Sequence, residues 1–151
     1  MVQVAVIGAA WEDPELNQLA GSVGVLLAEA GATLVCGGMG GVMEAACRGA
    51  RNAGGRTVGI VPDTGNGNPY LDVIIRTGLS HARNAIVAQS GDAIIAIGGS
   101  HGTLSEIAIG LKTGRKVFGL RTWDIESVTS CESPEEAVQG ALQAIATKHD
   151  E

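Results

Sequence analysis

Runs of almost purely apolar residues recur along the chain, and polar or glycine-rich stretches separate them. Such runs are typical of strands in a parallel sheet, because helices cover both faces of a sheet of this kind. The pattern predicts five strands and, more weakly, a sixth at 72–78. The five stronger runs are VQVAVIG (2–8), ATLVCGG (32–38), RTVGIVP (56–62), DAIIAIGG (92–99) and RKVFGL (115–120).

Helical patterns lie between these runs and carry the usual signals at their ends. Pro14 falls in the first turn of one pattern, and Gly31, Gly54 and Gly114 each follow the end of another. The helices that we predict cover residues 13–31, 41–54, 80–91, 103–114 and 133–149.

Strands that alternate with helices predict a single Rossmann-like α/β domain, with a doubly wound, mainly parallel sheet and helices on both faces. We expect this domain to cover residues 1–148, and residues 149–151 to form a loose tail.

A ligand crevice in such a sheet lies at the carboxyl ends of the strands, where the strand order reverses. We expect the crevice at the ends of strands 2–8, 32–36 and 92–97. The segment 62–70, rich in Gly, Asn and Pro, is either a surface loop or a mobile flap over this crevice.

The composition mainly excludes classes of protein. Hydrophobic residues make up 45% of the 151 residues and charged residues 17%, which excludes a disordered chain. The net charge of −6 argues against a nucleic-acid partner. No run approaches the ~18 apolar residues of a membrane span, and the first ten residues lack the charged segment of a signal peptide. We therefore expect a cytoplasmic protein with no membrane partner. The three Cys and three His are too widely spaced to predict a metal site.

Glycine is the outlier, since 23 Gly are about twice the usual share of roughly 7%. CGGMGG (36–41) and IGGSHG (97–102) share the form strand, GG-x-x-G, helix. Such a turn presents unpaired N–H groups at a helix N-terminus, which favours an anion. Two turns at one sheet edge favour a phosphate-bearing ligand. The residues that we predict to bind it are Gly8, Gly38, Gly40, Gly41, Gly98, Gly99, Gly102 and Thr103.

Two charged residues are candidates for chemistry. Thr103 and Glu106 form the pattern T-L-S-E, so Glu106 is either part of a capping box or a functional carboxylate. Arg83 lies near the start of its predicted helix, where a cation opposes the helix dipole. It either faces solvent or binds an anion, and arginine can hold a phosphate through two hydrogen bonds.

The stretches CGGMGGVMEAACRGARNAGGRTVGIVP and SHARNAIVAQSGDAIIAIGGSHGTLSE together resemble the LOG or lysine-decarboxylase-like (SLOG) superfamily. This superfamily includes cytokinin-activating phosphoribohydrolases and molybdenum-cofactor carrier proteins. Its enzymes carry the motif PGGxGTxxE and an Arg-Lys pair one helix earlier. The positions that match are Gly98, Gly99, Gly102, Thr103, Glu106 and Arg83. By this resemblance, Arg83 and Glu106 correspond to the arginine and glutamate that form the catalytic pair of the phosphoribohydrolases.

Two departures from the enzyme motifs favour the carrier branch, which binds nucleotides. Ile97 replaces the proline of the first motif, and Asn84 replaces the lysine that follows Arg83. The older family name, lysine decarboxylase-like, does not extend that activity to this chain, because no stretch of the sequence resembles a pyridoxal-phosphate lysine site.

Two functions therefore stay open. The chain either binds a nucleotide or the pterin phosphate of molybdenum cofactor as its ligand, with no other cofactor required, or it cleaves the N-glycosidic bond of a nucleoside 5′-monophosphate. Trp11, in the loop after the first strand, either stacks on a ligand ring or packs in the structure. The resemblance also implies a homodimer or homotetramer.

Overall fold

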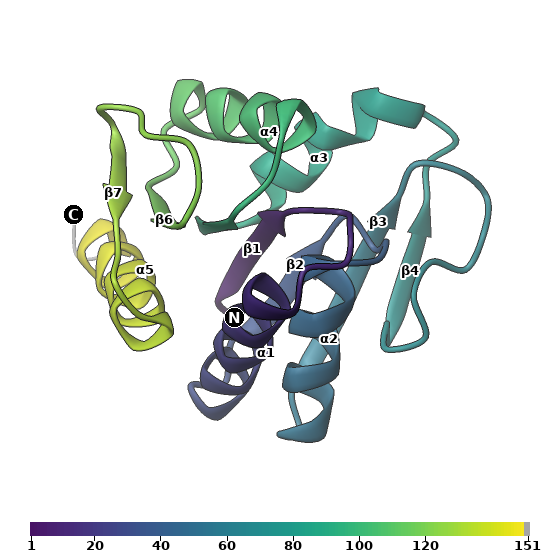
Figure 1. The fold of residues 1–151 in the computed structure, drawn as a ribbon, viewed down its shortest axis with the longest axis horizontal. Helices are drawn as coiled ribbons and strands as arrows, with labels where there is room; N and C mark the ends of the chain where they lie inside the picture. Colours follow the sequence, from purple (N-terminus) through teal and green to yellow (C-terminus); the bar gives the residue numbers. More distant parts are fainter. Residues whose placement is uncertain (150–151) are drawn as a thin grey trace.

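The computed structural model, which describes residues 1–149, is a seven-stranded parallel sheet with helices on both faces (Figure 1). The strand order is β4-β3-β2-β1-β5-β6-β7. The strands are β1 (Gln3–Gly8), β2 (Thr33–Cys36), β3 (Arg56–Val61), β4 (Val73–Arg76), β5 (Ala93–Ile97), β6 (Val117–Leu120) and β7 (Val128–Ser130). The helices are α1 (Pro14–Glu29), α2 (Val42–Asn52), the short 3-10 helix η1 (Ser80–Ala82), α3 (Arg83–Ser90), α4 (His101–Lys112) and α5 (Pro134–His149).

The predicted fold class is confirmed, and the six predicted strands each contain an observed one. Strand β7 was missed, because its three residues include two polar ones and form only the edge of the sheet. The predicted helix 80–91 is divided into η1 and α3. Of the predicted tail, His149 is the last residue of α5, and 150–151 lie outside the described residues.

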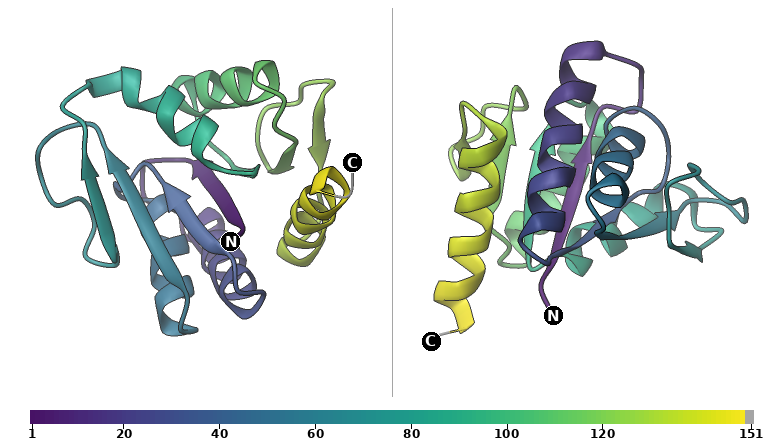
Figure 2. Two further views of the ribbon diagram at one scale, coloured as in Figure 1. Left: turned by 180° about the vertical axis from the view of Figure 1, so that it is seen from behind. Right: turned by 90° about the horizontal axis from the view of Figure 1, so that it is seen from below.

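The sheet separates two apolar cores. Figure 2 shows the helices on the two faces of the sheet. Helices α1, α2 and α5 pack on one face, and α3 and α4 pack on the other. The central strand β5, of sequence AIIAI, is buried throughout and supplies side chains to both cores. This double burial is the reason that its sequence is continuously apolar instead of alternating. No helix among the described residues is long and apolar enough to cross a membrane.

Strand order reverses at the centre of the sheet. The chain moves outward from β1 through β2 and β3 to β4, and then returns across the other face through α3 to β5. Strands β1 and β5 are therefore neighbours, and Gly8 is paired with Ile97 at their carboxyl ends. Their connections leave toward opposite faces, which opens a space for a ligand at this point.

Candidate functional site

A cavity of about 170 Å³ lies where β1 and β5 end. The β1–α1 loop, the start of α3 and the first turns of α4 supply most of its lining, and α2 adds one side chain. The lining residues are Gly8, Ala10, Trp11, Met43, His81, Arg83, Asn84, Ser100, Gly102, Thr103 and Glu106. The structure thus brings together Arg83, Glu106, Gly8, Gly102 and Thr103 from the predicted site.

The second glycine turn delivers α4 to this cavity. Gly98 and Gly99 have φ values of +59° and +104°, which non-glycine residues rarely adopt. A Cβ on Gly99 would lie 2.2 Å from Oγ1 of Thr103, so the turn also needs glycine for space. The tight turn allows α4 to begin directly beside the end of β5.

The capping-box interpretation of Thr103 and Glu106 is wrong. Helix α4 begins at His101, so its N-cap is Ser100, and no side chain caps it. Thr103 is the third helical residue instead of the cap, which places Glu106 too far into the helix to close a box. The N–H groups of a first helical turn have no partner within the helix. Those of Gly102 and Thr103 are therefore available at the cavity wall.

Glu106 is a buried carboxyl group in the cavity. It is only 7% exposed, and among the described residues it has no hydrogen-bond partner. Burial raises its pKa from 4.5 to about 7, and the positive charge of Arg83 opposes part of that rise. The group therefore exchanges its proton near neutral pH, as a general acid or base must.

Arg83 is the first residue of α3 and is partly buried. Its Nη2 donates to the carbonyl oxygen of Gly37 at 3.4 Å, and its Nη1 donates to Oδ1 of Asn84. Its Nε–H is buried and has no partner among the described residues. A buried donor without a partner costs free energy.

Two residues that hold Arg83 were not predicted as site residues. A Cβ on Gly37 would lie 2.9 Å from Nη2 of Arg83, so a larger residue there would displace the guanidinium from its present position. The buried Asn84 also donates from Nδ2 to Oγ of Ser105 at 3.2 Å, and that hydroxyl donates to the carbonyl of Gly102 at 2.7 Å. Asn84 thereby connects the start of α3 to the first turn of α4. The glycine doublet at 37–38 was the available signal for Gly37, and the position of Asn84 at the lysine of the Arg-Lys pair was the available signal for the second residue.

The first glycine turn lies beside the cavity but does not line it. Gly41 donates its N–H to Oε1 of Glu12 at 3.3 Å, and the N–H of Val42 donates to the carbonyl of Ala9 at 2.9 Å. The carbonyl of Gly38 accepts a hydrogen bond from the N–H of Asn68 at 2.8 Å. Through these three hydrogen bonds, the first glycine turn and the start of α2 hold the β1–α1 loop and the segment before β4 in place. Gly40, also predicted to bind the ligand, is not a lining residue either.

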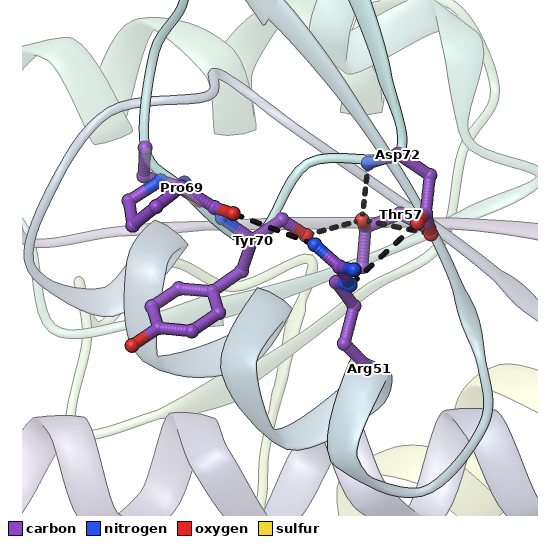
Figure 3. Close-up of polar contacts among 6 residues, drawn as sticks. Arg51, Thr57, Pro69, Tyr70 and Asp72 are labelled. Carbon is purple, nitrogen blue, oxygen red and sulfur yellow. Dashed lines mark hydrogen bonds and ion pairs between the residues drawn. The ribbon is translucent and has the colours of Figure 1, made fainter.

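The segment 62–70 is anchored at its second half (Figure 3). Thr57 donates from Oγ1 to the carbonyl of Tyr70 at 2.6 Å and from its N–H to Oδ2 of Asp72 at 2.8 Å. Arg51 forms an ion pair with Asp72 at 3.6 Å and donates to the carbonyl of Pro69 at 3.4 Å. No residue of 62–70 lines the cavity, so the hypothesis of a flap gains no support from this structure.

Comparison with known proteins identifies the family. Residues 1–147 match the SLOG cluster4 family, and the chain therefore belongs to that family. The molybdenum cofactor binding protein from Rippkaea orientalis is 34% identical, with a TM-score of 0.89 over 95% of this chain and 97% of that one. The molybdenum cofactor carrier protein from Chlamydomonas reinhardtii is 30% identical, with a TM-score of 0.88 over 96% and 98%. A cytokinin riboside 5′-monophosphate phosphoribohydrolase from Mycobacterium marinum is 37% identical over 108 residues, which are 66% of this chain and 56% of that protein.

Proposed function

We propose that this member of the SLOG cluster4 family binds a phosphorylated small molecule in the cavity at the start of α4 and does not cleave it. The ligand class is a nucleotide or the pterin phosphate of molybdenum cofactor. One observation carries the proposal: the side chain of Arg83 lines the same cavity as the uncapped first turn of α4. A phosphate there would accept hydrogen bonds from the first-turn N–H groups, and its charge would pair with the guanidinium of Arg83. The helix dipole would also favour that charge.

The relatives support this ligand class. The molybdenum cofactor binding protein and the carrier protein align with at least 95% of this chain, so they share its length as well as its fold. The phosphoribohydrolase from Mycobacterium marinum aligns with only 66% of the chain. Carrier proteins and phosphoribohydrolases both need a site for phosphate, whereas only the second needs a residue that breaks a bond.

Arg83 and the residues predicted to bind the ligand have the following roles under this proposal. Gly102 and Thr103 donate backbone N–H groups to the phosphate, and Arg83 pairs with its charge. Gly8 permits the close approach of β1 and β5, since a Cβ there would lie 2.1 Å from the carbonyl oxygen of Ile97. Gly98 and Gly99 shape the turn. Gly38, Gly40 and Gly41 support the site from the neighbouring turn.

A second candidate is phosphoribohydrolase activity, and the environment of Glu106 favours it. A buried carboxyl with a pKa of about 7, beside an arginine, resembles an acid–base group more than a structural one. In this reaction water replaces the base at the anomeric carbon, and a carboxylate stabilises the oxocarbenium-like transition state. The products would be the free base and ribose 5-phosphate.

Titration calorimetry tests the binding proposal. Probes are inorganic phosphate, adenosine monophosphate and molybdenum cofactor, applied to the wild type and to Arg83→Ala. Loss of a charge-assisted hydrogen bond should weaken binding by about 10- to 100-fold. The matched control is Arg121→Ala, because Arg121 is an exposed arginine that pairs with Glu15 outside the cavity. Absence of heat from every phosphorylated probe would contradict the proposal.

Release of free base separates the two candidates. The protein is incubated with adenosine monophosphate and its amine-substituted analogues, and the products are separated by chromatography. We expect no base. Release that Glu106→Ala abolishes, in a variant with an unchanged circular dichroism spectrum, would establish Glu106 as a catalyst and replace the carrier proposal.

A further inference from the structure

Trp11 occupies an unusual position for a large aromatic residue. It lies in the loop between β1 and α1, lines the cavity, and is 48% exposed. Neither apolar core includes it or has it packed against its surface. The interpretation of Trp11 as a residue of the core therefore gains no support from this structure.

Residues on both sides of Trp11 hold the loop in place. The N–H of Ala9 donates to the carbonyl of Ile97 at 3.2 Å, and the carbonyl of Ala9 accepts from Val42 at 2.9 Å. On the other side, Oε1 of Glu12 accepts from the N–H of Gly41 at 3.3 Å. An exposed indole on an anchored loop loses little conformational freedom when a ligand covers it.

Close packing against the first glycine turn adds to this anchoring. A Cβ on Gly41 would lie 2.3 Å from the carbonyl oxygen of Ala9 and 2.9 Å from that of Trp11. Gly41 also has a φ of +63°, which favours glycine. The first glycine turn therefore sets the position of Trp11, although it does not line the cavity itself.

The size of the cavity limits the part of a ligand that can enter it. Its volume of about 170 Å³ is below the ~300 Å³ at which typical small-molecule pockets begin. A phosphate and part of a sugar fit, and the rest of a nucleotide-sized ligand must leave through the mouth. The exposed side chains that line the cavity, and so border its mouth, include Trp11 and His81.

We propose that the indole of Trp11 is the surface on which the ring system of the ligand stacks. This inference rests on the proposed function, which places the phosphate at Arg83 and α4. It adds which residue receives the ring of that ligand, and that a simple sugar phosphate is not the preferred ligand. Stacking tolerates different rings, because every base or pterin has a π face.

Three probes separate the two parts of the ligand: ribose 5-phosphate, adenosine monophosphate and guanosine monophosphate. Affinities are measured by calorimetry for the wild type, Trp11→Ala and Trp11→Phe. We expect both nucleotides to bind about tenfold more tightly than ribose 5-phosphate. Trp11→Ala should remove that difference and leave the affinity for ribose 5-phosphate unchanged. Trp11→Phe should keep most of it, because a phenyl ring also stacks.

Tryptophan fluorescence gives an independent reading. The chain has two tryptophans, so Trp123→Phe leaves Trp11 as the sole reporter. We expect nucleotides to quench this emission and ribose 5-phosphate to leave it unchanged.

The outcomes distinguish failure of this inference from failure of the proposed function. Equal affinity for ribose 5-phosphate and the nucleotides, lost in Arg83→Ala, would overturn the role of Trp11 and leave the phosphate site standing. A smaller oligomer in Trp11→Ala, with an unchanged ratio of affinities, would assign the indole to a contact between copies and also overturn it. No binding of these three probes or of molybdenum cofactor would overturn both.

Discussion

At the scale of single residues, burial of Glu106 makes the free energy of unfolding depend on pH. Its pKa is about 7 in the folded chain and 4.5 in the unfolded reference. Between these values the folded state holds more protons than the unfolded state, so stability falls as the pH rises from 4.5 to 7. The difference corresponds to about 3 kcal/mol of lost stability above pH 7. A buried carboxyl group that destabilises the folded state in this way points to function.

Glu106→Gln should therefore stabilise the protein at high pH. The amide cannot ionise, so we expect the variant to be more stable than the wild type by roughly 1–3 kcal/mol at pH 8. Near pH 4.5, where the folded wild type is protonated, the two should be similar. Urea unfolding at both pH values measures the difference.

Glu29→Gln, at the exposed end of α1, is the control and should leave the pH dependence unchanged. A loss of stability at pH 8 in Glu106→Gln would contradict the argument, because it would mean that the structure stabilises the carboxylate.

At the scale of elements, the close contact of α1 with α2 positions the loops at their N-terminal ends. A Cβ on Gly24 would lie 2.0 Å from the carbonyl oxygen of Ala46, and one on Gly49 would lie 2.2 Å from that of Gly21. These are backbone atoms, which cannot move aside as a flexible side chain can. The approach brings the β1–α1 loop and the first glycine turn together, so Gly41 reaches Glu12.

Substitution of two glycines in α1 tests this packing. Gly24→Ala forces the helices apart, and we expect it to destabilise the protein by about 1–3 kcal/mol. In Gly21→Ala the new Cβ meets only the carbonyl of Ala45, at 3.8 Å. Alanine has the higher helix propensity, so this control should be neutral or stabilising by up to about 1 kcal/mol. Thermal unfolding compares the stability of the two variants with that of the wild type. If Gly24→Ala were as stable as Gly21→Ala, the close contact between the helices would be contradicted.

At the scale of the whole molecule, the edge strand β4 carries exposed apolar side chains. Among the described residues there are six large exposed hydrophobics: two lie on β4, one in the turn before η1 and one on α3, and the other two lie near the N-terminus. Val73 and Ile75, each 46% exposed, pair with Val58 and Ile60 on the same face of the sheet. Exposed apolar surface that is gathered in one place is typical of a contact between proteins.

We expect the chain to form a homodimer or homotetramer in solution. Light scattering at micromolar concentration should give two or four times the chain mass of 15.3 kDa. Ile75→Lys places a charge on the edge of the sheet and should lower that mass if this edge forms the contact. Glu29→Gln again serves as the control. A monomeric mass for the wild type would contradict the expectation.

Local sequence determined the order of the elements and the site's glycine turn. Continuous apolar runs such as AIIAI follow from burial on both faces of a parallel sheet, and this requirement acts on each strand by itself. The turn before α4 is equally local, because positive φ values demand glycine at 98 and 99. Both could therefore be predicted without knowledge of distant residues, as could the carboxyl edge on which the site lies.

Tertiary structure alone decided which groups meet there. Arg83 contacts Gly37, 46 positions earlier, and Asn84 contacts Ser105 on another helix. Gly41 resembles Gly102 in sequence, yet its N–H is paired with Glu12. Glu106 is a buried carboxyl group and not a cap, because α4 begins two residues before the pattern predicts. These facts depend on how separate elements pack, and the free energies of burial and hydrogen bonding that follow from packing are not written in any short stretch of the chain.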